Sequence, residues 1–280
     1  VHDSQSSTLG GVEMSHYPAS GTWQACPKCG RHVHQRQWGT YQQCPYCHYW
    51  QRLTTAQRLE QLVDEGAFQP LTMTELPVNQ LGFPDYTNKL RRAQRQTGLN
   101  EAVVCGTALI EQQPCILAVM DSHFMMGTLN TAVTRRLLHA SEQARAQRLP
   151  LIIVTASGGA RMQEGVYALV GMNLILAELA RLAATPLPLI TVLTDPTMGG
   201  VSASFAFKGD LIIAEAGAKI GFAGARVIQQ TLPVKLPADF QTADQLFKNG
   251  MVDAVVERPQ LRSTLGQALV NYGIGRSAHG

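Results

Sequence analysis

Residues 151–165 read LIIVTASGGARMQEG, and residues 189–207 read LITVLTDPTMGGVSASFAF. Each segment begins with a short apolar run and continues through a turn with a Gly-Gly pair into a predicted helix. Glycine has no Cβ, so the backbone N–H groups of such a turn stay open to a ligand. The helix that follows adds unpaired amides and a partial positive charge. Two such turns predict a site that stabilises negative charge as it develops on an acyl oxygen.

Three motifs carry a resemblance to a known family. They are SGGARMQE at 157–164, LTDPTMGGVSASFA at 193–206 and IGFAGARVIQQT at 220–231. Together they resemble the carboxyltransferase β subunit of bacterial acetyl-CoA carboxylase, and the likeness extends from about residue 23 to about residue 262. The resemblance implies an α/β fold, the crotonase or ClpP-like spiral of β-β-α turns, over residues 51–262.

The resemblance also implies a reaction. A carboxyl group moves from carboxybiotin to acetyl-CoA, giving malonyl-CoA for fatty acid synthesis. The sequence contains no Ala-Met-Lys-Met-like biotin attachment segment and no P-loop, so we expect biotin to arrive on a separate carrier protein. The family's α subunit supplies the other half of the active site, and the implied assembly is α2β2.

We assign oxyanion stabilisation to the amides of Gly158 and Gly159, where each donor of this kind contributes about 3–4 kcal/mol. Gly199 and Gly200 either add a donor or shape the pocket. The motifs hold no acid–base pair, which fits a reaction in which the biotin enolate accepts the substrate proton.

Residues beside these turns are expected to contact the cofactor. They are Ser157, Arg161 and Gly127. For Arg161 and Glu164, a salt bridge that fixes the turn is the alternative interpretation.

Residues 123–138, HFMMGTLNTAVTRRLL, differ from the family pattern. A glycine-rich turn is usual here, but only Gly127 of its glycines is present. Met126, Asn130 and Thr134 stand where glycine is expected. This difference motivates a second hypothesis, a catalytically impaired β-like subunit that acts through assembly or nucleic-acid binding.

Residues 23–50 predict a zinc ribbon. Cys26 and Cys29 form one Cys-x-x-Cys pair, Cys44 and Cys47 form another, and fourteen residues separate the pairs. Four thiolates complete a tetrahedral zinc site, and the metal then stabilises a segment too short to fold by burial alone.

The ribbon is also basic and aromatic. It contains all three tryptophans, and no Asp or Glu lies between Trp23 and Leu59. Such a surface suits contact with single-stranded nucleic acid. The other interpretations are aromatic packing around the metal with basic residues offsetting its thiolates, or contact with the acyl-CoA entrance or a partner subunit.

A third hypothesis is a ClpP-like serine peptidase, since Ser202 and Ser204 follow a Gly-Gly pair. It requires a neighbouring histidine, and His123 and His139 are the candidates.

Composition sets the remaining expectations. The net charge of +3 does not by itself indicate nucleic-acid binding. We expect no signal peptide and no membrane span, and six cysteines with paired spacing suit a reducing compartment, hence the cytoplasm. A flexible polar tail is expected at 1–22 and a C-terminal tail at 263–280, and one long helix is expected over 162–182.

Overall fold

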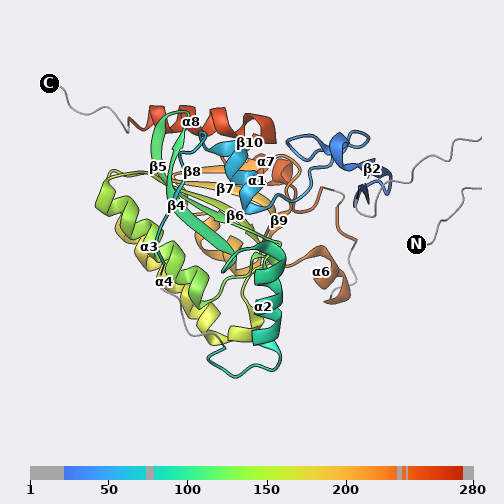
Figure 1. Cartoon of the computed structure of the whole chain (residues 1–280), viewed down its shortest axis with the longest axis horizontal. Coiled ribbons are helices and arrows are strands. Elements are labelled where there is room, and N and C mark those ends of the chain that lie inside the picture. Colours follow the sequence, from blue (N-terminus) through green and yellow to red (C-terminus); the bar gives the residue numbers. More distant parts are fainter. Residues whose placement is uncertain (1–21, 74–78, 232–234, 238, 274–280) are drawn as a thin grey trace, which may run out of the picture. The chain divides into compact units, whose positions relative to one another are not determined.

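The computed structural model describes residues 22–73, 79–231, 235–237 and 239–273. The chain divides into two compact units between Gln51 and Arg52. The expected tail at 1–22 lies almost wholly outside the described residues. Figure 1 shows the elements of both units.

The first unit is a small ribbon. Strands β1 (Trp23–Ala25) and β2 (His32–His34) pair antiparallel, and the 3-10 turn η1 (Gln35–Trp38) follows. Its buried core consists of Cys26, Val33, Trp38 and Cys44. Because two of these four residues are cysteines, the apolar core of this unit is small.

The second unit is built on one sheet with the strand order β10-β8-β7-β6-β5-β4-β3, and β9 pairs with β7. Pairings from β5 through β10 are parallel, whereas β3 and β4 pair antiparallel at one edge. The strands are β3 (Gln69–Pro70), β4 (Val103–Ile110), β5 (Gln113–Met120), β6 (Leu151–Ser157), β7 (Leu189–Met198), β8 (Leu211–Glu215), β9 (Ile220–Gly221) and β10 (Ala254–Val256).

Helices and short helical turns connect the strands. They are α1 (Thr55–Leu62), α2 (Tyr86–Thr97), η2 (Met125–Gly127), α3 (Thr131–Gln147), η3 (Met162–Glu164), α4 (Val166–Ala183), α5 (Gly199–Val201), the π-helical η4 (Ser202–Ala206), α6 (Ala225–Thr231), α7 (Ala243–Lys248), η5 (Arg258–Gln260) and α8 (Leu261–Asn271).

Helices cover both faces of the sheet. Alternate residues of a strand point to opposite faces, and in β6 Leu151 and Ile153 join one core cluster while Ile152 and Val154 join the other. The first cluster includes residues of α3 and α4, and the second includes residues of α1 and α8. Figure 1 shows α3 and α4 running together on one side of the sheet and α8 on the other. This burial on both faces explains why β6 reads as a continuous apolar run.

Two sequence expectations need correction. The expected tail at 263–280 is helical as far as Asn271, because Leu265 and Leu269 of α8 are fully buried against the sheet. The long helix expected over 162–182 is interrupted at Gly165, whose φ of 51° and ψ of −127° are not helical. Arg161 and Glu164 therefore precede α4 and do not lie in its first turn.

One described helix, α4, is long and apolar enough to cross a membrane by length and composition alone. It packs against α3 and contributes Ile175, Leu179 and Leu182 to the first core cluster. These contacts place it in the architecture of the second unit.

Candidate active site

The two glycine turns lie against each other. They follow β6 and β7, which are parallel neighbours with Ser157 paired to Thr197. A Cβ built on Gly159 would lie 3.3 Å from the Cα of Gly199, and one built on Gly199 would lie 3.2 Å from the Cα of Gly159. Both residues also have positive φ, 114° and 59°. Glycine is required at both positions by conformation and by contact.

Most amides of the two turns are already bonded. The Gly158 amide donates to the Met126 carbonyl at 2.8 Å, and the Gly199 amide donates to the Phe222 carbonyl at 2.9 Å. The Gly159 amide donates to Ser157 Oγ at 3.1 Å. The sequence assignment of donors to the Gly158-Gly159 pair therefore does not match the bonding in the structure.

Two neighbouring amides are open instead. Among the residues that the structure describes, the backbone N–H of Ala160 donates to no backbone acceptor. Gly200 is the second residue of α5, and the amides in the first turn of a helix have no acceptor within the helix. Both residues are partly exposed, and a Cβ built on Gly200 would lie 3.9 Å from the Ala160 nitrogen. The paired turns thus present one open donor each on the same part of the surface.

Ser157 and Gly127 hold the backbone of the first glycine turn in place. Ser157 is fully buried, and its hydroxyl caps the Gly159 amide. Gly127, with a φ of 64°, packs so tightly that a Cβ would collide with the Ala156 carbonyl oxygen. Both residues shape the first turn, and neither presents a side chain to a ligand.

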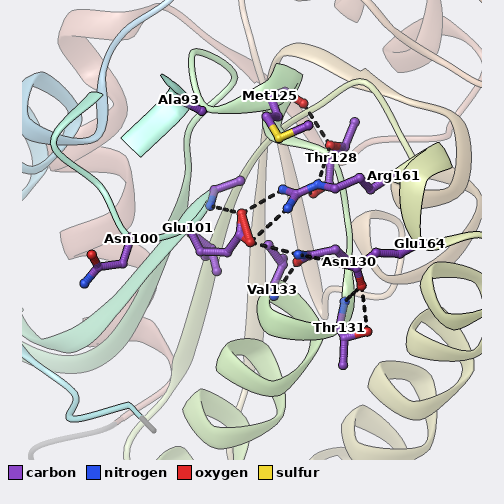
Figure 2. A network of polar contacts seen from close by, with 12 residues as sticks. Ala93, Asn100, Glu101, Met125, Thr128, Asn130, Thr131, Val133, Arg161 and Glu164 are labelled. Carbon is purple, nitrogen blue, oxygen red and sulfur yellow. Dashed lines mark hydrogen bonds and ion pairs between the residues drawn. The ribbon is translucent and has the colours of Figure 1, made fainter. Parts of the chain in front are cut away.

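Arg161 is buried in a polar network (Figure 2). Arg161 is 1% exposed, and its guanidinium donates to both carboxylate oxygens of Glu101, at 2.8 and 2.9 Å. It also donates to the Tyr86 hydroxyl at 3.2 Å and to the Thr128 hydroxyl and carbonyl at 3.1 and 3.0 Å. Burial acts to lower the pKa of Arg161, but the Glu101 carboxylate and Tyr86 outweigh it and raise that pKa. These contacts surround the guanidinium and fix the first glycine turn, and the expected cofactor contact of Arg161 stays a prediction.

Glu164 completes the network. Its carboxylate accepts hydrogen bonds from Tyr86 at 2.7 Å, from Asn130 at 2.9 Å, and from the amide and hydroxyl of Thr131 at 2.9 and 2.7 Å. Burial acts to raise the pKa of Glu164, and these donors more than offset it, so that pKa is lowered. Burial raises the pKa of Tyr86 to about 12. The network joins the first glycine turn to α2 and to the start of α3.

Among the described residues, Arg161 forms its salt bridge with Glu101 and not with Glu164, the partner expected from the motif. The partners of both residues lie far from the motif in the sequence. Glu101 lies 60 positions before Arg161, and Tyr86 lies 78 before Glu164. In the sequence, the only local indication that Glu101 has a role is that this acidic residue comes just before an apolar strand. Nothing in the sequence near Tyr86 or Asn130 indicates that they belong to the network.

The three residues that replace expected glycines are accommodated differently. Asn130 is the N-cap of α3 in extended conformation, and its side chain accepts from the Val133 amide at 2.8 Å. Thr134 is buried against Gly171 of α4, where a second side chain would not fit. Only Met126 adopts positive φ, at 60°. Positions 130 and 134 therefore do not require glycine.

An apolar pocket adjoins the second turn. Its volume is about 430 Å³, and Phe207, Phe222 and Phe240 are among its lining residues. Ser202, also in its lining, donates to the carbonyls of Gly199 at 2.9 Å and Gly221 at 2.7 Å. Ser202 thus connects the pocket lining to the backbone of the second turn.

These bonds contradict the peptidase hypothesis. Ser202 and Ser204 both donate to backbone carbonyls within their own helical segment. His123 pairs with Asp121 at 2.8 Å, and His139 lies 3.7 Å from Glu142. In the described structure, no histidine is bonded to either serine hydroxyl, so neither serine has a general base.

The four ribbon cysteines converge. Their Sγ atoms all lie within 4.8 Å of one another, with Cys26 and Cys47 at 3.6 Å and Cys29 and Cys44 at 3.9 Å. A tetrahedron with metal–sulfur bonds of about 2.3 Å has edges of about 3.8 Å. The backbone repeats the same knuckle twice, with Gly30 donating to Cys26 and His48 donating to Cys44. The cluster has the geometry of a four-thiolate metal site.

The basic residues of the ribbon are exposed. Arg31 lies over the Tyr46 ring with its Cζ 5.0 Å from the ring centre, and Lys28 and Arg36 point to solvent. Arg31 and Tyr46 thus form a cation–π contact on the surface of the ribbon. Nucleic-acid contact stays a prediction.

Comparison with known proteins identifies the family of the chain. The carboxyl transferase domain family matches residues 48–273. The acetyl-coenzyme A carboxylase carboxyl transferase subunit beta 1 of Lactiplantibacillus plantarum (strain JDM1) is 99% identical over 267 residues, covering 95% of this chain and all of the relative. A Clostridium tetani protein described as subunits beta/alpha is 44% identical, covering 88% of this chain and 43% of the relative.

A solved structure shows the same fold. The transcarboxylase 12S core matches with a TM-score of 0.66 and 23% identity, covering 78% of this chain and 41% of that one. The prediction of a crotonase-like α/β fold with an N-terminal four-cysteine cluster is thereby confirmed. The chain belongs to the carboxyl transferase family, among the β subunits of acetyl-coenzyme A carboxylase.

Proposed function

We propose that this chain provides the acyl-CoA-activating half of a carboxyltransferase that moves a carboxyl group from carboxybiotin to acetyl-CoA, giving malonyl-CoA. The observation that carries this proposal is the pair of open amides at Ala160 and Gly200. Removing a proton beside a thioester creates negative charge on its carbonyl oxygen. Two fixed donors stabilise that charge without reorganising, and each contributes about 3–4 kcal/mol in comparable sites.

The chain's own residues hold these donors in place. Ser157 bonds the Gly159 amide, and the buried network around Arg161 fixes the segment that follows. Rigid support of this kind preserves donor geometry, which determines how much transition-state stabilisation is achieved. Biotin, delivered on a separate carrier protein, supplies the carboxyl group and accepts the proton, so the site needs no titrating side chain.

We assign Zn²⁺ to the four-cysteine cluster in a structural role. Thiolate ligands and S–S separations of 3.6 and 3.9 Å fit this ion. It would stabilise the ribbon, whose apolar core is small. Nucleic-acid binding by the ribbon would appear as salt-dependent affinity for single-stranded RNA or DNA.

The α subunit would dock on the exposed face of α4. Val166, Leu169, Val170 and Leu174 repeat at helical spacing and are 47 to 61% exposed. A continuous apolar stripe of this kind marks an interaction surface. The fused beta/alpha protein of Clostridium tetani supports an α subunit as its occupant. We place the resulting α2β2 assembly in the cytoplasm.

The docking surface has a direct test. The double variant Leu169→Lys/Leu174→Lys is expected to abolish co-purification with the α subunit, whereas Gln96→Lys on the exposed face of α2 leaves it intact. Co-purification of the double variant at the wild-type ratio would place the interface elsewhere.

The reaction is tested by malonyl-CoA-dependent carboxylation of free biotin. We expect activity from the zinc-loaded chain mixed with its α subunit and none from either chain alone. An inactive but stable and zinc-loaded complex would overturn the catalytic proposal and favour the impaired-subunit hypothesis.

A further inference from the structure

Met126 has an unusual backbone. Met125, Met126 and Gly127 have φ values of 45°, 60° and 64° in succession. Positive φ is uncommon for residues other than glycine, and it persists only where the surroundings enforce it. The local sequence therefore accepts strain at Met126 that a glycine would relieve.

Backbone hydrogen bonds hold this conformation. The Met126 carbonyl accepts from the Gly158 amide at 2.8 Å, and the Met125 carbonyl accepts from the Thr128 hydroxyl at 2.8 Å. The Gly127 amide donates to the Phe124 carbonyl at 2.8 Å. These bonds fix the direction in which the Met126 side chain leaves the backbone.

That side chain lies beside the first glycine turn. Its Cβ and Cε are 3.5 and 3.9 Å from the position that a Cβ on Gly158 would take. Met126 is 48% exposed, and Gly158 is exposed too. The thioether arm thus stands at the open surface of the turn and is not packed into the core.

A second methionine stands at the other turn. The Met172 sulfur occupies the place where a Cβ on Gly200 would be. A methionine side chain from another element therefore lies beside each of the two turns that hold the open amides of Ala160 and Gly200. Methionine is apolar and flexible, so it forms an adaptable wall.

We propose that the Met126 side chain limits the length of the acyl chain that this site accepts, and so favours acetyl-CoA over longer acyl-CoA substrates. The proposal rests on the proposed function. With the thioester oxygen held by the open amides, the acyl carbons lie one or two bonds away, within reach of an apolar wall at Gly158. Shortening that wall makes room for additional methylene groups.

The test uses the zinc-loaded complex with the α subunit and compares kcat/KM for malonyl-CoA and ethylmalonyl-CoA in biotin carboxylation. One methylene in an apolar pocket changes selectivity by about 10- to 200-fold. Met126→Ala is expected to raise the ethylmalonyl-to-malonyl ratio at least about tenfold. Met126→Leu, which conserves volume, is expected to keep the ratio within about threefold of wild type.

Met126→Gly removes the side chain and relieves the strain, so it carries the test if Met126→Ala fails to fold. Gln112→Gly is the matched control. Gln112 is exposed in the turn between β4 and β5 and has a φ of 64°. It precedes β5, which is parallel to β6, so it lies at the opposite end of the sheet from the glycine turn that follows β6. It relieves similar strain and should leave the ratio unchanged.

The outcomes separate the two proposals. A wild-type complex that is inactive with every acyl-CoA contradicts the proposed function. An active wild type whose ratio is unchanged in folded Met126→Ala or Met126→Gly contradicts the role of Met126 alone. Loss of all activity in both folded variants also contradicts it, since a selectivity wall is dispensable for the smallest substrate.

Discussion

The carboxylate of Glu101 accepts two hydrogen bonds, of 2.9 and 2.8 Å, from the guanidinium of Arg161, although 60 positions separate the two residues in the chain. Both side chains are almost completely buried. Removing one partner leaves the other charge without compensation, which typically costs about 3–5 kcal/mol. We expect Glu101→Ala to lower the free energy of unfolding by about this amount. Urea denaturation measures it.

The paired change Glu101→Leu/Arg161→Met is the control, because replacing both charges by apolar groups is often much less costly. If Glu101→Ala unfolds at the wild-type urea concentration, the buried pair does not have the energetic role given to it here.

Alanine at position 159 should abolish activity, whereas alanine at position 158 should be tolerated. Gly159 has a φ of 114° and touches the second turn, so Gly159→Ala is expected to cost more than about 2 kcal/mol and to abolish carboxyltransfer. A Cβ on Gly158 would meet only ordinary contacts at 3.5 Å, and no unusual φ is required there. Equal activity losses in the two variants would show that the contact between the turns is unimportant.

Asn130 tests whether glycine is preferable at that position. Asn130→Gly removes the side-chain cap of α3 and the donors to Glu101 and Glu164. Glu101 and Glu164 keep their other donors, but each loses one hydrogen bond to a charged group, which contributes about 1.5–3 kcal/mol. The variant should therefore be less stable despite matching the family pattern. Thermal unfolding of the two proteins decides this, and a variant as stable as wild type would refute the structural role.

Stability should fall in acid because of Glu164. Its pKa in the folded protein is lowered, so the unfolded chain binds the proton more readily. The contribution is complete above the unfolded value of about 4.3 and is lost as pH falls through the lower folded pKa. Glu164→Gln should therefore be less stable than wild type at pH 7, with the difference narrowing below about pH 4. Urea midpoints between pH 3 and 7 would reveal a constant difference if this linkage were absent.

Thiol reactivity should report the metal site. Burial raises the pKa of Cys105 and of Cys115 to about 12, so neither reacts at pH 8 while folded. A thiol reagent should find no fast-reacting group in the zinc-loaded chain, four after chelation and all six only in denaturant. Fast reaction of the ribbon thiols in the loaded chain would exclude a four-cysteine metal site.

The sequence predicts the strands well where apolar runs meet glycine turns, as at β6 and β7. It also places the cysteine cluster, because ligand spacing reflects coordination geometry. It fails for the network, because Tyr86, Glu101 and Asn130 become neighbours only when α2, β4 and α3 pack together. The bonding state of individual amides likewise depends on partners such as Met126 and Phe222, which lie outside the glycine motifs. The family likeness extends only to about residue 262, in the first turn of α8, so it does not predict the rest of that helix.

The parallel pairing of β6 and β7 fixes the distance between the two glycine turns. Hydrogen-bonded strands lie about 4.8 Å apart, and that interval sets the separation of the two turns almost independently of side chains. In the proposed reaction, recognition of the thioester carbonyl would depend on the backbone, whereas preference among acyl groups would depend on side chains such as Met126. Evolution can revise the second property through single substitutions and leave the first untouched.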